Sequence, residues 1–148
     1  MIERYSRKEL KNIWHDYNKY SIWLKIELAA AEAMEKFKII PRGISKKVKS
    51  KAKINVKRIQ DIENKVKHDV IAFLTSVNEK VGKESRYLHK GMTSSDVLDT
   101  CFNIQLKQSG EILLKDINTL LMCIKKQAIK HKYTLCIGRS HGIHAEPI

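Results

Sequence analysis

Two histidines lie three residues apart in the last stretch of the chain, GRSHGIHAEPI. With Cys136 before them, His141 and His144 could be zinc ligands, but this C-x4-H-x2-H spacing matches no structural zinc pattern and lacks a fourth ligand. They could also be ordinary core or surface histidines. A third interpretation is an acid–base histidine on a turn, because flanking glycine lets a ligand approach the backbone closely. The residues alone leave these alternatives open.

A second candidate is the stretch HKGMTSSD, from His89 to Asp96. Gly91 permits a tight turn, after which Thr93 is expected at the N-cap of a long helix with Asp96 at its third position. This pattern predicts a cap that stabilises the helix by about 1 kcal/mol. The same hydroxyls, with free amides at the positive end of the helix dipole, also suit a carboxylate or phosphate. Spacing alone does not decide between the cap and the anion site.

Two further groups of polar side chains precede this stretch. Lys67, His68 and Asp69 place a cation, a titratable imidazole and a carboxylate at another expected helix start. Arg4 and Tyr5 could hold a phosphate through charge-assisted hydrogen bonds. Taken singly, each group is also explained by a helix cap or an exposed surface.

Composition narrows the class of protein. A chain of 148 residues can bury a core of its own, and 43% hydrophobic with 30% charged residues argues against wholesale disorder. Three cysteines at long, irregular spacing do not make a disulfide framework and favour a reducing cytosol. The charged N-terminus has no apolar segment typical of a signal peptide, and no apolar run approaches the ~20 residues of a membrane span. We therefore expect a cytoplasmic protein without membrane contacts.

The net charge of +13 raises the question of a polyanionic partner. The excess is carried by 23 lysines against 6 arginines, spread along expected helices. Base recognition and RNA-binding grooves favour arginine and clustered aromatic residues, so a solvated lysine-rich surface is the preferred interpretation and a basic nucleic-acid-binding module the alternative. The sequence also lacks GK[ST], G-x-S-x-G and G-x-G-x-x-G motifs, and it implies no cofactor and no metal.

The elements that position these residues are expected to be helices. Residues 6–9 form a Ser-x-x-Glu capping box that predicts the start of a first helix. An alanine-rich amphipathic helix is predicted over residues 16–38, followed by Pro41 and Gly43, which end it. The apolar stripe expected on this helix comprises Tyr17, Tyr20, Leu24, Leu28 and Ala31.

Two more helices are expected after a short lysine-rich segment. The first is capped by Asn55, and its inward residues should be Val56, Ile59 and Val66. The second opens near residues 68–69 and is closed by Gly82.

The stretch from Thr93 to about Lys132 contains no proline and a single glycine, Gly110, and keeps a helical spacing of apolar residues. An unbroken helix of this size would be about 60 Å long, more than a compact domain of this chain could cover. It must then pack against something outside the chain, as in extended and often oligomeric bundles. After it, residues 133–142 lose the helical period and suggest an extended turn. We predict an all-α fold with a small helical domain over residues 1–92 and the start of a long-helix bundle over residues 93–148.

The order and spacing of four stretches are more specific than any one of them. MIERYSRKELKNIW, KHDVIAFL, YLHKGMTSSDVLDT and KYTLCIGRSHGIHAEP, in this succession, resemble the adenylosuccinate lyase family of the fumarase/aspartase superfamily. The resemblance covers the whole chain. The segment GRSHGIHAEP separates this branch from fumarases and argininosuccinate lyases, which carry other residues after the first histidine.

The resemblance implies a β-elimination that breaks a C–N bond. Adenylosuccinate would give AMP and fumarate, and the related intermediate SAICAR would give AICAR and fumarate. A base removes the proton next to a carboxylate, and the resulting dianion must be stabilised by fixed donors. A general acid then protonates the departing nitrogen, a task suited to an imidazole that titrates near neutrality. No cofactor takes part.

Family roles carried onto this sequence make His141 the general acid. The implied substrate-binding residues are Arg4, Tyr5, Lys67, His68, Asp69, His89, Thr93 and Ser94. Of these, Thr93 and Ser94 resemble the binders of the succinyl carboxylates. The residues before His89 resemble the contacts to the nucleotide's phosphate and ribose, and His89 itself resembles a residue that supports binding beside the site.

The sequence departs from the family in three respects. Lys67 stands where arginine is usual, which replaces a bidentate fork by a point charge. Ser140 replaces the more usual threonine and keeps the hydroxyl. The family's mobile loop, with the serine taken as the base and a substrate-binding lysine, is missing, as is the acidic partner of the general acid.

Family sites are assembled from three subunits of a homotetramer. We therefore expect the chain to be an N-terminal part of the enzyme, inactive alone and prone to self-association through its exposed apolar helix. Another lyase of the superfamily is the alternative enzyme.

Overall fold

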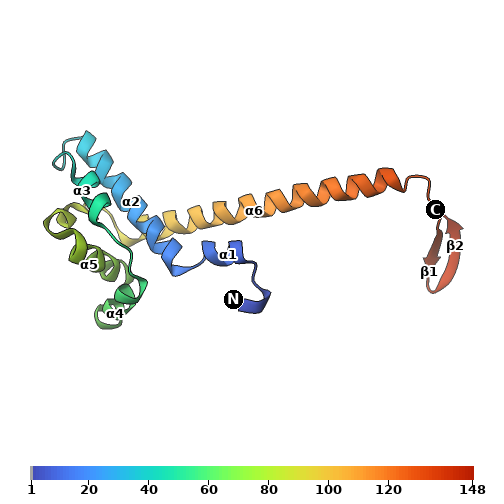
Figure 1. The fold of residues 1–148 in the computed structure, drawn as a ribbon, viewed down its shortest axis with the longest axis horizontal. Helices are drawn as coiled ribbons and strands as arrows, with labels where there is room; N and C mark the ends of the chain where they lie inside the picture. The colour runs from blue at the N-terminus through green and yellow to red at the C-terminus, as the bar shows by residue number, and fades with distance from the viewer. Residues whose placement is uncertain (1) are drawn as a thin grey trace. The chain divides into compact units, whose positions relative to one another are not determined.

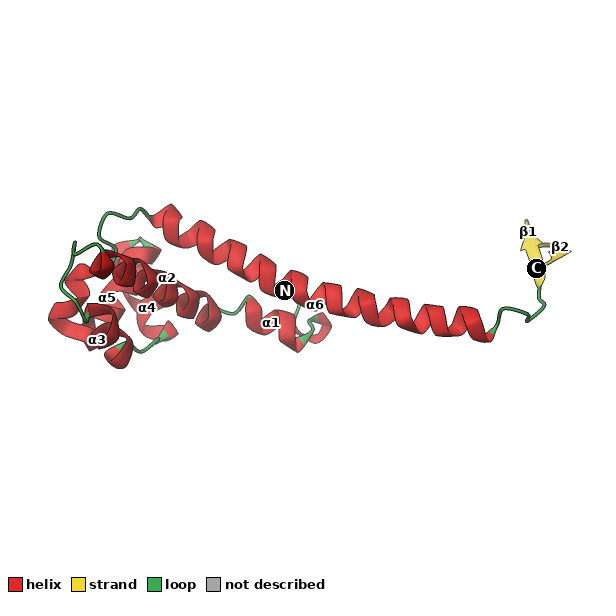
Figure 2. Cartoon of the chain, turned by 90° about the horizontal axis from the view of Figure 1, so that it is seen from above, coloured by secondary structure: helices red, strands yellow, loops and turns green. Residues whose placement is uncertain are grey.

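The computed structural model of the protein describes residues 2–148, and most of them are helical (Figure 2). The chain divides into two compact units, one ending at Ser109 and the other covering Gly110–Ile148, with the division inside the longest helix. The all-α class is confirmed, since the strands in the described part of the chain form only a short hairpin. Nowhere in residues 2–148 is a helix long and apolar enough to cross a membrane. The domain boundary expected at residue 92 stays a prediction.

Helices form almost all of the first unit (Figure 1). In chain order they are η1 (Glu3–Tyr5), α1 (Lys8–Ile13), α2 (Asp16–Lys36), α3 (Ile44–Lys51), α4 (Val56–Val66), α5 (Asp69–Val81), η2 (Gly82–Tyr87) and the first part of α6 (Ser94–Lys130). Two expected helix boundaries are confirmed. The Asn55 side chain accepts from the Arg58 amide to cap α4, and Gly82 ends α5 with a positive φ of 79°. The lysine-rich segment is itself helix α3, because Ile44 and Val48 bury one face of it.

The predicted capping box at the first helix is wrong. Helix α1 begins after Arg7, one residue later than the box requires, and the Ser6 hydroxyl donates instead to the Ile2 carbonyl at 2.7 Å. Glu9 pairs with the Arg7 guanidinium at 3.3 Å. The serine therefore stabilises the turn of η1 and not the helix that follows, because its hydroxyl donates to a carbonyl four residues earlier.

An aromatic cluster lies at the centre of the core. Tyr20 and Trp23 of α2 meet edge to face at 5.2 Å, and Phe73 of α5 packs against both rings at 6.0 and 5.5 Å. All three side chains are at most 2% exposed. Such pairs add about 0.5–1.5 kcal/mol beyond their burial. Tyr20 and Phe73 thus join α2 to α5 in the first unit, which is called the lobe below.

Two expected core positions are wrong. Tyr17 is 58% exposed, because the buried face of α2 begins one turn later, at Tyr20, and includes Trp23. Val66 is 45% exposed at the end of α4, where Ile62 is buried in its place. Both errors lie at helix ends, where the chain leaves the core and the helical period no longer decides which side chains are buried.

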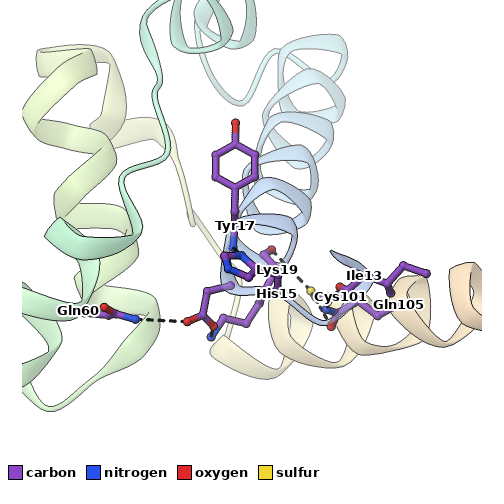
Figure 3. A network of polar contacts seen from close by, with 8 residues as sticks. Ile13, His15, Tyr17, Lys19, Gln60, Cys101 and Gln105 are labelled. Atoms are coloured by element: carbon purple, nitrogen blue, oxygen red, sulfur yellow. Dashed lines mark hydrogen bonds and ion pairs between the residues drawn. The ribbon is translucent and has the colours of Figure 1, made fainter. Parts of the chain in front are cut away.

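Polar contacts attach the junction of α1 and α2 to α6 (Figure 3). The Gln105 amide donates to the Ile13 carbonyl at 2.8 Å, and the Trp14 indole N–H donates to the Ser109 hydroxyl at 3.1 Å. Asp16 pairs with Lys19 at 3.1 Å and accepts from Gln60 of α4. The first part of α6 is therefore built into the lobe by both apolar and polar contacts.

The second unit contains the rest of α6 and a hairpin of β1 (Ile137–Ser140) and β2 (Ile143–Pro147). The strands are antiparallel, with the pairs Ile137–Pro147, Arg139–His144 and Ser140–Ile143. The register has a bulge between Ile137 and Arg139, and a side chain on Gly138 would meet the Glu146 carbonyl at 3.1 Å. The extended turn expected here is confirmed, as a hairpin.

Candidate active site

The start of α6 carries the predicted carboxylate-binding hydroxyls. Thr93 directly precedes the helix, and its amide donates to the Asp96 carboxylate at 2.8 Å, while the Asp96 amide donates to the Thr93 carbonyl at 3.1 Å. Thr93 and Asp96 therefore stand before the helix and at its third position, as expected, and the Asp96 carboxylate caps the Thr93 amide. Ser94 and Ser95 occupy the first two helical positions, whose amides have no partner within the helix. The cap and an anion site can coexist here, because the cap uses the Thr93 amide and leaves these two.

His89 is held in a turn just before this helix start. Its φ of 56° is unusual for a non-glycine residue, and Gly91 two positions later also has a positive φ, of 71°. Both carboxylate oxygens of Glu27 on α2 contact His89. One lies 2.7 Å from the His89 amide and the other 2.7 Å from the ring Nδ1. Glu27 is completely buried, whereas the His89 side chain is 18% exposed. The turn thus presents a partly exposed imidazole that is fixed from behind by a buried carboxylate.

Lys67, His68 and Asp69 form the junction between α4 and α5. Lys67 ends α4 in the left-handed conformation, with φ 55°, and His68 is the N-cap of α5, its Nδ1 accepting weakly from the Ile71 amide at 3.4 Å. Asp69 Oδ1 accepts from the Val70 amide at 2.7 Å. The helix cap is therefore His68 and not Asp69. Lys67 and His68 are exposed and available to a ligand.

A hollow of about 290 Å³ connects this junction to α6 within the first unit. Asp69 lines it together with Lys19 from α2 and with Asp99 and Phe102 from the second and third turns of α6. Cys101 also lines the hollow, but it is 2% exposed, and burial raises the pKa of its thiol, which disfavours the thiolate form. The hollow thus places charged side chains beside the second and third turns of α6.

Arg4 and Tyr5 lie in the short helix η1. The guanidinium carbon of Arg4 is 4.8 Å from the centre of the Tyr5 ring, and both side chains are exposed. The pair presents a cation and a phenol to solvent, as an anion-binding pair would.

His141 lies at the tip of the hairpin in the second unit. His141 and Gly142 form the two-residue loop with φ of 51° and 76°, and positive φ at both positions is what a type I′ turn requires. His141, His144 and Cys136 are all exposed. In residues 2–148, no three His, Cys, Asp or Glu side chains are placed to hold a metal ion together. The tip of the hairpin presents the His141 imidazole to solvent.

All candidate residues except His141 lie in the first unit. Sequence reasoning missed Glu27, although a signal for it exists. Glu27 follows Trp23 by four residues and precedes Ala31 by four, so an acidic residue stands on the buried face of α2. A buried carboxylate must have donors, which in this fold are the amide and ring of His89.

Comparison with known proteins identifies the relatives of this chain. A family model described as lyase matches residues 1–148. The chain is 49% identical over 148 residues to the adenylosuccinate lyase of Synechocystis sp. and 46% identical over 147 residues to that of Staphylococcus saprophyticus. The alignments cover 100% and 99% of this chain but 34% of each relative. The chain therefore spans about a third of the length of these curated relatives.

Solved structures support the fold. The fumarate lyase from Mesorhizobium sp. BNC1 matches with a TM-score of 0.87 at 21% identity, and the 3-carboxy-cis,cis-muconate lactonizing enzyme from Pseudomonas putida with a TM-score of 0.84 at 22% identity. Each match covers 97% of this chain and 34% of the other. At such identities the likeness extends to the fold alone. The family model matches all 148 residues of this chain, and the chain therefore belongs to the lyase family of the fumarase/aspartase superfamily.

Proposed function

We propose that the complete protein containing this chain is an adenylosuccinate lyase. It would release fumarate from adenylosuccinate to give AMP, and from SAICAR to give AICAR. The observation that carries this proposal is the 46–49% identity to two curated adenylosuccinate lyases along essentially the whole chain. We further propose that the protein acts in the cytoplasm.

In the proposed reaction, a base from outside this chain removes a proton from the carbon next to one succinyl carboxylate. The electron pair first forms a dianionic aci-carboxylate, and then makes the fumarate double bond as the C–N bond breaks. The pair of that bond goes to the departing nitrogen, which takes a proton from His141. An imidazole suits this step because it can hold and release a proton near neutral pH.

The other residues would bind the substrate. Thr93 and Ser94 would hold the succinyl carboxylates, because hydroxyls and unpaired amides at the start of α6 are fixed donors for developing negative charge. Arg4 and Tyr5, and the junction of Lys67, His68 and Asp69, would hold the phosphate and ribose. His89 would support binding beside the helix start. Lys67, where the family carries arginine, would contact the phosphate as a point charge.

The site would be completed by parts of the protein outside this chain. The exposed apolar residues of the second unit support packing against further helices, in a homotetramer whose sites are shared between subunits. The 148-residue chain alone would then be inactive.

The test is to express the complete protein and to measure fumarate release from adenylosuccinate and SAICAR, with argininosuccinate and aspartate as comparison substrates. Activity that requires the purine nucleotides supports the proposal. Turnover of another succinyl-amine without them would assign the protein to a different lyase of the superfamily. A Thr93→Ala/Ser94→Ala variant with unchanged kcat/KM would remove these hydroxyls from the site.

A further inference from the structure

We propose that Glu27 is a positioning residue for the proposed lyase reaction, which fixes the ring of His89 in one tautomer and one orientation toward the substrate. This inference rests on the proposed function and adds to it a residue in the middle of α2. Glu27 itself would not contact the substrate, because its side chain has no exposed surface. It would act entirely through the imidazole.

Two bonds from one carboxylate fix the position of His89. Oε2 of Glu27 accepts from the His89 backbone amide at 2.7 Å, and Oε1 lies 2.7 Å from the ring Nδ1. The first bond holds the backbone in its unusual conformation with φ 56°. The second fixes rotation of the ring. A single bond would leave either the backbone or the ring free to move, so the bidentate contact does more than satisfy a buried charge.

The contact also determines which ring nitrogen is available. A carboxylate can only accept hydrogen bonds, so the ring donates to Glu27 through its Nδ1–H. Nε2 is then the nitrogen on the opposite edge of the ring. Nδ1 faces a fully buried group, whereas 18% of the side chain is exposed, so a ligand would approach the ring from its other edge. Substrate would therefore meet His89 at Nε2.

The location of this pair suits a role in binding. His89 precedes Ser94, the first residue of α6, by five positions, and the turn between them is closed by a bond from the Met92 amide to the His89 carbonyl at 3.4 Å. Glu27 lies on the same helix as Tyr20 and Trp23, the two aromatic anchors of the core. The carboxylate is thus carried by a helix that is anchored in the core, and its two bonds hold the imidazole to that helix.

The test uses the complete enzyme once it has been shown to turn over adenylosuccinate, so that failure of the proposed function is recognised first. Glu27→Gln keeps the shape of the side chain. Its oxygen can still accept from the His89 amide, but its NH₂ then faces Nδ1 and favours the opposite tautomer. We expect kcat/KM to fall about 10–100-fold, the usual effect of removing an orienting partner, while the variant keeps its assembly and its circular dichroism spectrum.

A double-mutant cycle separates positioning from a purely structural effect. If Glu27 acts through His89, Glu27→Gln will cause no further loss of kcat/KM in a His89→Ala background. Losses that multiply, or a folded Glu27→Gln enzyme within threefold of the wild type, overturn the proposal. Glu35→Gln is the matched control, since Glu35 is another acidic residue of α2 that accepts from two backbone amides, those of Gly43 and Ser45; its kcat/KM should not change.

The wild-type enzyme decides the matter if Glu27→Gln does not fold. Diethyl pyrocarbonate acylates unprotonated ring nitrogens; mass spectrometry maps the adducts to residues, and NMR of the modified peptide distinguishes Nε2 from Nδ1. We expect a single adduct on His89, at Nε2, which forms at least about tenfold more slowly when AMP and fumarate are bound. An adduct at Nδ1, or modification of His89 at the same rate with and without ligands, overturns the proposal.

Discussion

The two units share helix α6, but only in the first unit are any of its side chains buried. In the first unit, α6 buries Val97, Cys101 and Gln105 against the lobe. In the second, none of the residues 110–148 is buried, although Leu113, Ile117, Leu120 and Ile124 repeat at helical spacing. The apolar pattern does not weaken where the lobe ends. A sequence pattern therefore predicts that a face will be covered, but not whether the same chain covers it.

The candidate site follows the same division. In the first unit, His89 is held by a buried partner, and the hydroxyls follow on a helix that is packed into the core. In the second, His141 is held only by the local geometry of its turn. Precision of position comes from tertiary packing in one unit and from two positive φ angles in the other.

The largest effect is expected from His141→Asn in the complete protein. Asparagine tolerates the left-handed conformation, so the turn survives, but it cannot act as an acid. We expect kcat for adenylosuccinate to fall by about 10²–10⁴. Thermal stability should hardly change, because the side chain is exposed.

His144→Asn is the control for this variant, since His144 lies in the same hairpin and is equally exposed. It should keep most of the activity. A His141→Asn enzyme with normal kcat would remove His141 from the reaction, and a large loss of stability in it would show that the turn is more than a local structure.

The next largest effect is a loss of stability that should differ between a substitution in the first unit and one in the second. Phe73→Ala in the 148-residue chain removes the ring that packs on Tyr20 and Trp23, and should lower the free energy of unfolding by about 3–5 kcal/mol. Leu120→Ala should change it by less than about 0.5 kcal/mol, because Leu120 is 59% exposed. Urea denaturation followed by circular dichroism measures both. Equal losses in the two variants would mean that the second unit is packed in solution.

Local sequence signals predicted the helices well, because caps and glycines act on their own neighbours. Asn55 and Gly82 each set a helix boundary with one contact or one φ angle. The prediction failed at Ser6, whose hydroxyl bonds the Ile2 carbonyl and does not cap the next helix. It also failed at Tyr17 and Val66, which lie near helix ends where the chain leaves the core.

The site was less predictable than the fold. Residue types and the family resemblance identified the candidate residues, but not what holds them. The contact between Glu27 and His89 joins residues 62 positions apart, and no local pattern relates them. Likewise, the two-residue turn that contains His141 depends on the pairing of both strands, which the loss of helical period could only suggest.

The smallest effect concerns the uncovered face of α6. The 148-residue chain should self-associate through its apolar stripe, because exposed leucine and isoleucine side chains at helical spacing find each other in water. Ile117→Lys/Leu121→Lys places two charges on this stripe and should weaken association about tenfold, or ~1.4 kcal/mol. Thr119→Lys/Cys123→Lys adds the same charges at the same spacing on the opposite face and should have little effect. Sedimentation velocity under reducing conditions compares the two. If both variants weaken association equally, the effect is due to net charge and not to the apolar stripe. The second unit would then differ from the first in solubility, and its exposed face would not be a surface for packing.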